Sequence, residues 1–81
     1  MEETVLSFVR RQFKVSVGNR PLDAHTPLFS TGIVDSFGVL ELIAFLEDTF
    51  GVEIDPATHE IAEFDTAAKI AVLVQRLKQG S

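Results

Sequence analysis

The most regular part of the chain runs over residues 35–50 and reads DSFGVLELIAFLEDTF. Asp35 suits the N-cap of a helix, because its carboxylate can accept hydrogen bonds from N–H groups of the first turn. Gly51 follows the last turn, where a left-handed cap is favoured. At about 100° per residue, one face carries an apolar stripe: Val39, Leu42, Ile43, Leu46 and Phe50. The pattern predicts a helix over residues 36–50 that packs this stripe against a core.

The sector beside this stripe mixes a hydroxyl, apolar groups and carboxylates. Its members are Ser36, Phe37, Leu40, Glu41, Ala44, Glu47 and Asp48. A helix with only a structural role more often presents uniformly polar side chains there. The sector is therefore the candidate functional surface. The alternatives are a solvated face for the carboxylates, and packing of Leu40 and Ala44 against the third helix.

Helical patterns also precede and follow this segment. Val5, Val9 and Phe13 recur at a spacing of four and predict a helix over residues 2–14, with acidic residues in its first turn and basic residues near its end. A strand over residues 14–17 is the alternative there, although its alternating pattern ends after too few residues to matter.

Two shorter signals complete the helical pattern. The Asp55-Pro56 pair predicts a short third helix over residues 56–63, because proline is tolerated at the first helical position. A second capping pair, residues 65–66, precedes a last helix over residues 66–78. This last helix carries an apolar stripe: Ile70, Leu73, Val74 and Leu77.

The connection over residues 18–34 is long and shows no periodicity. Its apolar residues indicate that it packs down on the core: Leu22, Leu28, Phe29, Ile33 and Val34. The predicted fold is therefore all-α: a single domain over residues 1–81, forming a small antiparallel four-helix bundle with a short third helix and a long first loop.

Composition narrows the function classes. The chain has 81 residues, a formal charge of −5 and no Cys, which excludes disulfides and thiolate metal sites. The acidic balance argues against nucleic-acid binding. No segment approaches the roughly 20 apolar residues of a membrane span. The acidic N-terminus lacks the cationic region of a signal peptide. We expect a monomeric, cytoplasmic protein.

The chain contains no recognisable catalytic set. His25 and His59 are far apart in the sequence, and neither has an acid or a thiol at metal-ligand spacing, so we expect no metal site. Ser36 has no evident histidine base. No glycine-rich phosphate loop is present. These patterns indicate a protein that is not an enzyme.

Ser36 can serve as an attachment point instead. It follows Asp35 at the start of the longest predicted helix. The N–H groups of that turn and the positive end of the helix dipole favour an anionic substituent by about 0.3–1 kcal/mol. The alternative is that Asp35-Ser36 is only a capping pair.

The residues around Ser36 resemble the carrier protein family, whose acyl, peptidyl and aminoacyl carriers bear 4′-phosphopantetheine on serine. The family motif, Gly-x-x-Asp-Ser followed by an apolar residue, reads Gly32-Ile33-Val34-Asp35-Ser36-Phe37. Further matching segments are residues 27–29, 40–43, 46–51 and 52–54. The likeness extends from about Thr4 to Leu77.

Two residues depart from the common bacterial fatty-acid carrier pattern. Phe37 replaces the usual leucine, and Gly38 stands where an acidic residue is frequent. Because glycine inside a helix costs about 1 kcal/mol relative to alanine, Gly38 requires a packing or docking reason. Together with residues 63–66, these features resemble D-alanyl and stand-alone aminoacyl carriers.

The resemblance implies a carrier whose cargo is a thioester on a 4′-phosphopantetheine arm attached to Ser36. A phosphopantetheinyl transferase would supply the chemistry, and coenzyme A the group. Asp35 would orient the site. The partners implied are acyl- or amino-acid-activating ligases and downstream transferases or synthases of fatty acid, polyketide or nonribosomal peptide biosynthesis. They would dock on Phe37, Leu40, Glu41, Ala44, Glu47 and Asp48.

Two other function classes compete with the carrier interpretation. In a helical protein–protein interaction module without a prosthetic group, Ser36→Ala would change stability only as loss of a cap does, by up to about 1–2 kcal/mol, and would leave activity intact. A helix-turn-helix DNA reader would need a basic stripe, to which only Arg10, Arg11 and Lys14 contribute, and the net charge disfavours it.

Overall fold

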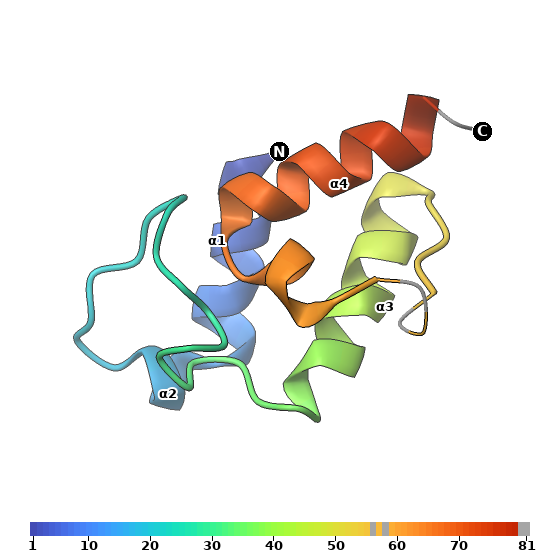
Figure 1. The fold of residues 1–81 in the computed structure, drawn as a ribbon. Coiled ribbons are helices and arrows are strands. Elements are labelled where there is room, and N and C mark those ends of the chain that lie inside the picture. Colours follow the sequence, from blue (N-terminus) through green and yellow to red (C-terminus); the bar gives the residue numbers. More distant parts are fainter. Residues whose placement is uncertain (56, 58, 80–81) are drawn as a thin grey trace.

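The computed structural model describes residues 1–79 apart from 56 and 58. The helices are α1 (Glu2–Gln12), α2 (Lys14–Val17), α3 (Gly38–Phe50), the 3₁₀ helix η1 (Ile61–Phe64) and α4 (Ala67–Gln79). The described residues contain no strand. In Figure 1, α1 and α3 run in opposite directions beneath α4, and the long first connection loops out to one side. The predicted all-α class with a short third helix is confirmed.

The first helix is interrupted at Phe13. The backbone of Phe13 has φ −116° and ψ 36°, outside the helical region, and it separates α1 from the single turn of α2. The helix predicted over residues 2–14 therefore ends at Gln12. The strand alternative over residues 14–17 is wrong, because these residues form a helical turn.

The third helix is shorter and later than predicted. A helix over residues 56–63 is wrong: η1 begins at Ile61, and residues 56 and 58 lie outside the described residues. Glu60 is extended, with ψ 155°, and its N–H donates to Glu63 Oε2 at 2.9 Å. This bond belongs to a capping box that makes Glu60 the N-cap of η1.

The last helix begins as its capping pair predicts. Thr66 Oγ1 accepts a hydrogen bond from Lys69 N at 3.1 Å, and Thr66 O accepts one from Ile70 N at 3.0 Å. Thr66 thus satisfies two N–H groups of the first turn. The predicted helix over residues 66–78 is displaced by one residue, within the ordinary spread of helix boundaries.

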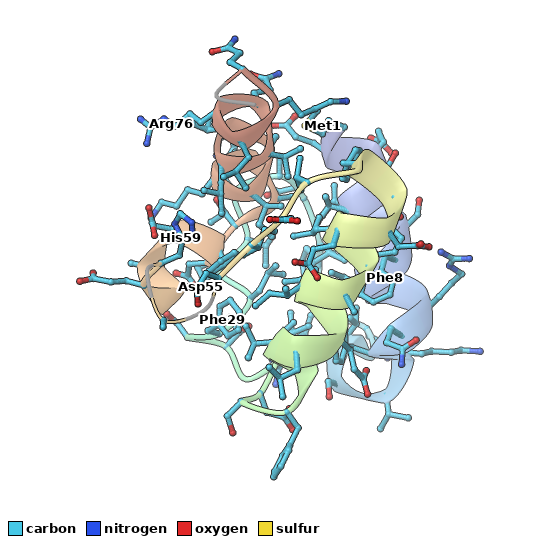
Figure 2. The ribbon with its side chains drawn as sticks, turned by 90° about the vertical axis from the view of Figure 1, so that its right-hand side faces the viewer. Met1, Phe8, Phe29, Asp55, His59 and Arg76 are labelled. Carbon is cyan, nitrogen blue, oxygen red and sulfur yellow. The ribbon has the colours of Figure 1, made fainter. Side chains whose placement is uncertain are left out.

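The core lies between α1, α3, α4 and the long connection. Leu42, Leu46, Val9 and Ile70 are completely buried, and Phe64 is 2% exposed. Across the α1–α3 contact, the rings of Phe8 and Phe45 stack with their centroids 4.1 Å apart. Phe8 is labelled at this contact in Figure 2.

The long connection packs on the core, as its apolar residues predict. Leu28 is completely buried, and Ile33 and Val34 are each 1% exposed. Leu28 N donates to Asp65 O at 2.6 Å, and Phe29 N donates to Asp65 Oδ1 at 3.1 Å. The connection is therefore fixed to the junction of η1 and α4, and it delivers the chain to the start of α3.

Candidate functional site

The carboxylate of Asp35 organises the start of α3. Its Oδ1 accepts hydrogen bonds from Phe37 N at 3.1 Å and from Gly38 N at 2.7 Å, and its carbonyl accepts one from Val39 N at 3.0 Å. The predicted N-cap is thus confirmed in its bonds, although the regular helix begins at Gly38 rather than at residue 36. Residues 36–37 form a turn that leads into the helix.

Ser36 lies on the surface in this turn, between the capping residue and the first helical residue. The side chain is exposed, and the part of the chain that the structure describes offers it no histidine base. The start of α3 lies at the edge of the molecule in Figure 2, away from α4. A large enzyme can therefore reach this hydroxyl without unfolding the domain.

The electrostatics of the turn differ from the expectation in one respect. The N–H groups of Phe37 and Gly38 both donate to Asp35 Oδ1, so they are not available to a phosphodiester on Ser36. The expected stabilisation of an anionic substituent by these N–H groups is therefore wrong. Asp35 already supplies the negative charge that the helix dipole favours.

The apolar members of the mixed sector remain on the surface. Phe37 is 80% exposed and Leu40 is 58% exposed, and Ala44, one turn further along α3, is also exposed. The alternative that Leu40 and Ala44 pack against the third helix is wrong. Exposed apolar side chains at this spacing form a patch beside Ser36.

The three carboxylates of the sector are not equivalent. Glu41 Oε2 accepts a hydrogen bond from Gln12 Nε2 at 2.8 Å. Glu47 is half-buried, and its Oε2 accepts one from Ile54 N at 2.9 Å, which holds the segment after α3. Asp48 is exposed and makes no hydrogen bond or ion pair with a described residue. Glu41 and Glu47 therefore make hydrogen bonds within the domain, whereas Asp48 makes none with the residues that the structure describes.

The two histidines form no metal centre among the described residues. His59 Nδ1 lies 3.1 Å from Glu63 Oε2, and its ring meets the edge of Phe64. His25 is exposed in the long connection. Figure 2 places His59 over the segment before α4, away from the start of α3.

Comparison with known proteins assigns the family. The model of the phosphopantetheine attachment site matches residues 3–74. The chain belongs to the phosphopantetheine-attachment family of carrier proteins. It is 35% identical over 78 residues to the "Probable acyl carrier protein PigG" of Serratia sp., spanning 96% of this chain and 88% of PigG. It is also 35% identical over 78 residues to D-alanyl carrier protein 2 of Lactiplantibacillus plantarum, spanning 94% of that protein.

The fold of this carrier domain matches that of a solved carrier protein. The solution structure of a holo acyl carrier protein from Nitrosomonas europaea superposes with a TM-score of 0.74, covering 99% of this chain and 96% of that one at 22% identity. The family assignment, rather than this likeness of fold, makes the chain a carrier protein with a covalent 4′-phosphopantetheine group, and carriers of this family are not themselves enzymes. An exposed hydroxyl at residue 36, beside a carboxylate engaged in capping, fits such a group.

Proposed function

We propose that Ser36 is the attachment residue and that this domain holds its cargo as a thioester on the 4′-phosphopantetheine arm. The support is the exposed hydroxyl in a turn that two Asp35 hydrogen bonds hold in place. The transferase supplies the base and coenzyme A supplies the group, so Ser36 needs no catalytic partner within this chain. The stretch Gly32–Phe37, which resembles the family motif, has its serine at the same residue.

Asp35 has a second role in this proposal. Its Oδ1 accepts both capping hydrogen bonds, which hold the turn that carries Ser36 at the start of α3. The negative charge of the carboxylate beside the hydroxyl suits the metal–coenzyme A complex in the transferase. Asp35 is therefore a positioning residue with two separate effects: its hydrogen bonds hold the turn, and its charge acts in the complex with the transferase.

The docking surface is centred on Phe37, Leu40 and Ala44, with Asp48 at its rim. The three apolar side chains are exposed beside the attachment point, and the Asp48 carboxylate has no described partner. Apolar contacts at the centre of an interface supply affinity, whereas rim charges steer encounter with a basic groove. Glu41 and Glu47 add negative charge from positions that the fold already holds.

An aminoacyl cargo is the load we propose. D-alanyl carrier proteins are among the relatives, and the Asp35–Gly38 stretch resembles such carriers. A cavity of about 540 Å3 lies over η1 and α4, but no α3 residue lines it. Leu42 and Leu46 of α3 are completely buried in a packed core. A long acyl chain would need space beside α3, whereas an aminoacyl group would not.

The partners of this domain are then a phosphopantetheinyl transferase, an amino-acid-activating ligase and a downstream transferase or synthase, rather than enzymes of fatty acid synthesis.

We place it in the cytoplasm as a monomeric single domain over residues 1–81. None of the described helices has both the length and the apolar character to cross a membrane.

Intact mass spectrometry tests the attachment residue. The apo chain is incubated with coenzyme A and a phosphopantetheinyl transferase, and a gain of one phosphopantetheine group is expected. Ser36→Ala abolishes the gain, whereas Ser30→Ala, which alters another exposed serine, leaves it unchanged. A gain that survives Ser36→Ala, or no gain at all, contradicts the proposal and favours the interaction module. Incubating the holo form with amino-acid and fatty-acid ligases identifies the cargo.

A further inference from the structure

Three cationic side chains surround one cavity at the end of the first two helices. Arg10 lies in the last turn of α1, Lys14 opens α2, and Arg20 lies in the long connection. The cavity measures about 400 Å3, with Val17 and Leu22 among its apolar lining. None of the described residues that line it is acidic. We call it the basic cavity.

Backbone contacts tether two of these side chains. Arg10 Nη2 donates a hydrogen bond to Leu22 O at 3.0 Å, and Arg20 Nη1 donates one to Thr31 O at 2.7 Å. A guanidinium has five N–H donors, so one such bond leaves most of them for a ligand. The tethers also reduce the conformational entropy that ordering these side chains around a ligand would cost.

The positive charge at this cavity has no counter-charge in the described structure. The chain has 12 Asp and Glu residues, yet Arg10, Lys14 and Arg20 form no ion pair with any described carboxylate. A helix C-terminus favours nearby cations and accounts for Arg10. It does not account for Arg20, which lies outside every helix. Three gathered cations raise the local positive potential, which an anion would relieve.

We propose that the basic cavity binds a phosphate-type anion. Guanidinium groups present forked donors that match phosphate oxygens bidentately, and a lysine adds a mobile point charge. This site is separate from the proposed function, because neither Ser36 nor Asp35 lines it. The phosphate can be free, or it can belong to coenzyme A, which carries a diphosphate and a further phosphate group.

NMR titration of the ¹⁵N-labelled Ser36→Ala domain with inorganic pyrophosphate, at constant ionic strength, tests the site. Saturable shifts are expected in the backbone amides of residues 17–20 and of Leu22, since Pro21 has no N–H. Lys14→Gln should weaken binding about fivefold, as loss of one exposed charge contact implies. Lys14 is the residue to change because neither backbone tether depends on it. The matched control Lys69→Gln removes one charge on α4 and should leave binding unchanged.

Parallel titrations distinguish the sources of the phosphate. Binding of pyrophosphate and coenzyme A, with none of pantetheine, supports coenzyme A as a ligand. Binding of pyrophosphate alone supports free phosphate. The proposal is overturned if no shift saturates, or if Lys14→Gln and Lys69→Gln weaken binding equally. Because Ser36→Ala is used throughout, failure here leaves the attachment proposal unaffected.

Discussion

The ring of Phe13 occupies the space that a side chain at position 38 would need. A Cβ built on Gly38 would lie 2.6 Å from Phe13 Cε1, closer than real Cβ contacts come, and 3.0 Å from Phe13 Cζ, which is tighter than most of them. A Val34 methyl group would lie 3.2 Å away. The break between α1 and α2 thus packs directly against the first residue of α3, two residues after Ser36. This contact is the packing reason for a glycine at the start of α3.

Gly38→Ala should therefore destabilise the domain, contrary to helix propensity. Alanine is better than glycine by up to about 1 kcal/mol, a value reached in helix interiors, whereas Gly38 is the first residue of α3, and overpacking costs about 1–3 kcal/mol. We expect a net loss of up to about 2 kcal/mol in the free energy of unfolding, measured by urea denaturation. In a Phe13→Leu background the ring atoms are absent, and the same change should become neutral or stabilising. A stabilising effect in the wild-type background would contradict this contact.

Asp35 variants should separate capping from charge. Asp35→Ala removes the acceptor for two N–H groups and should lower the free energy of unfolding by about 1 kcal/mol. Asp35→Asn retains a capping oxygen and should unfold much like the wild type, yet it should accept phosphopantetheine more slowly. Urea denaturation and transfer kinetics on the same samples make the comparison. Equal rates of phosphopantetheine transfer for the wild type and Asp35→Asn would show that the negative charge of Asp35 has no role in the transfer.

Loss of the Glu47 carboxylate should destabilise the domain, whereas loss of the Asp48 charge should leave its stability nearly unchanged. Glu47→Ala leaves Ile54 N without its acceptor and should cost about 1–2 kcal/mol in unfolding free energy. Asp48→Asn should change stability by less than about 0.5 kcal/mol. Asp48→Asn should slow the transfer of phosphopantetheine to the domain at low salt, and added salt should reduce the difference in rate from the wild type. A destabilised Asp48→Asn variant would refute the assignment of Asp48 to the docking rim.

The stability of the long connection should depend on pH through the ionisation of the Asp23 carboxyl group. The His25 N–H, 2.8 Å from Asp23 Oδ1, and the Thr26 hydroxyl lower the pKa of this carboxyl below its usual value. Since the pKa is lowered on folding, the stabilisation is present above the ordinary value of about 3.9 and is lost as pH falls through the folded value. Thr26→Val should raise the pKa, as followed by NMR of the carboxyl carbon. An unchanged titration would exclude the hydroxyl as a cause.

Local patterns predicted the helices well where their ends carried strong signals. Asp35 and Thr66 make the capping contacts expected of them. The third helix was predicted too early, because Asp55-Pro56 is a sound local start signal while the Glu60–Glu63 capping box makes Glu60 the actual N-cap. The break at Phe13 has no periodic signal in the sequence, and the Phe13 ring there lies against Gly38, which is distant along the chain.

The sequence by itself determined the all-helical class, the carrier family and the candidate attachment residue, because capping, periodicity and motif spacing act within a few residues of chain. Only the tertiary structure decided which carboxylates remain available to a partner, why position 38 has no side chain, and where Arg10, Lys14 and Arg20 meet. Those relationships join residues distant in sequence, and packing of the helices and the long connection brings them together.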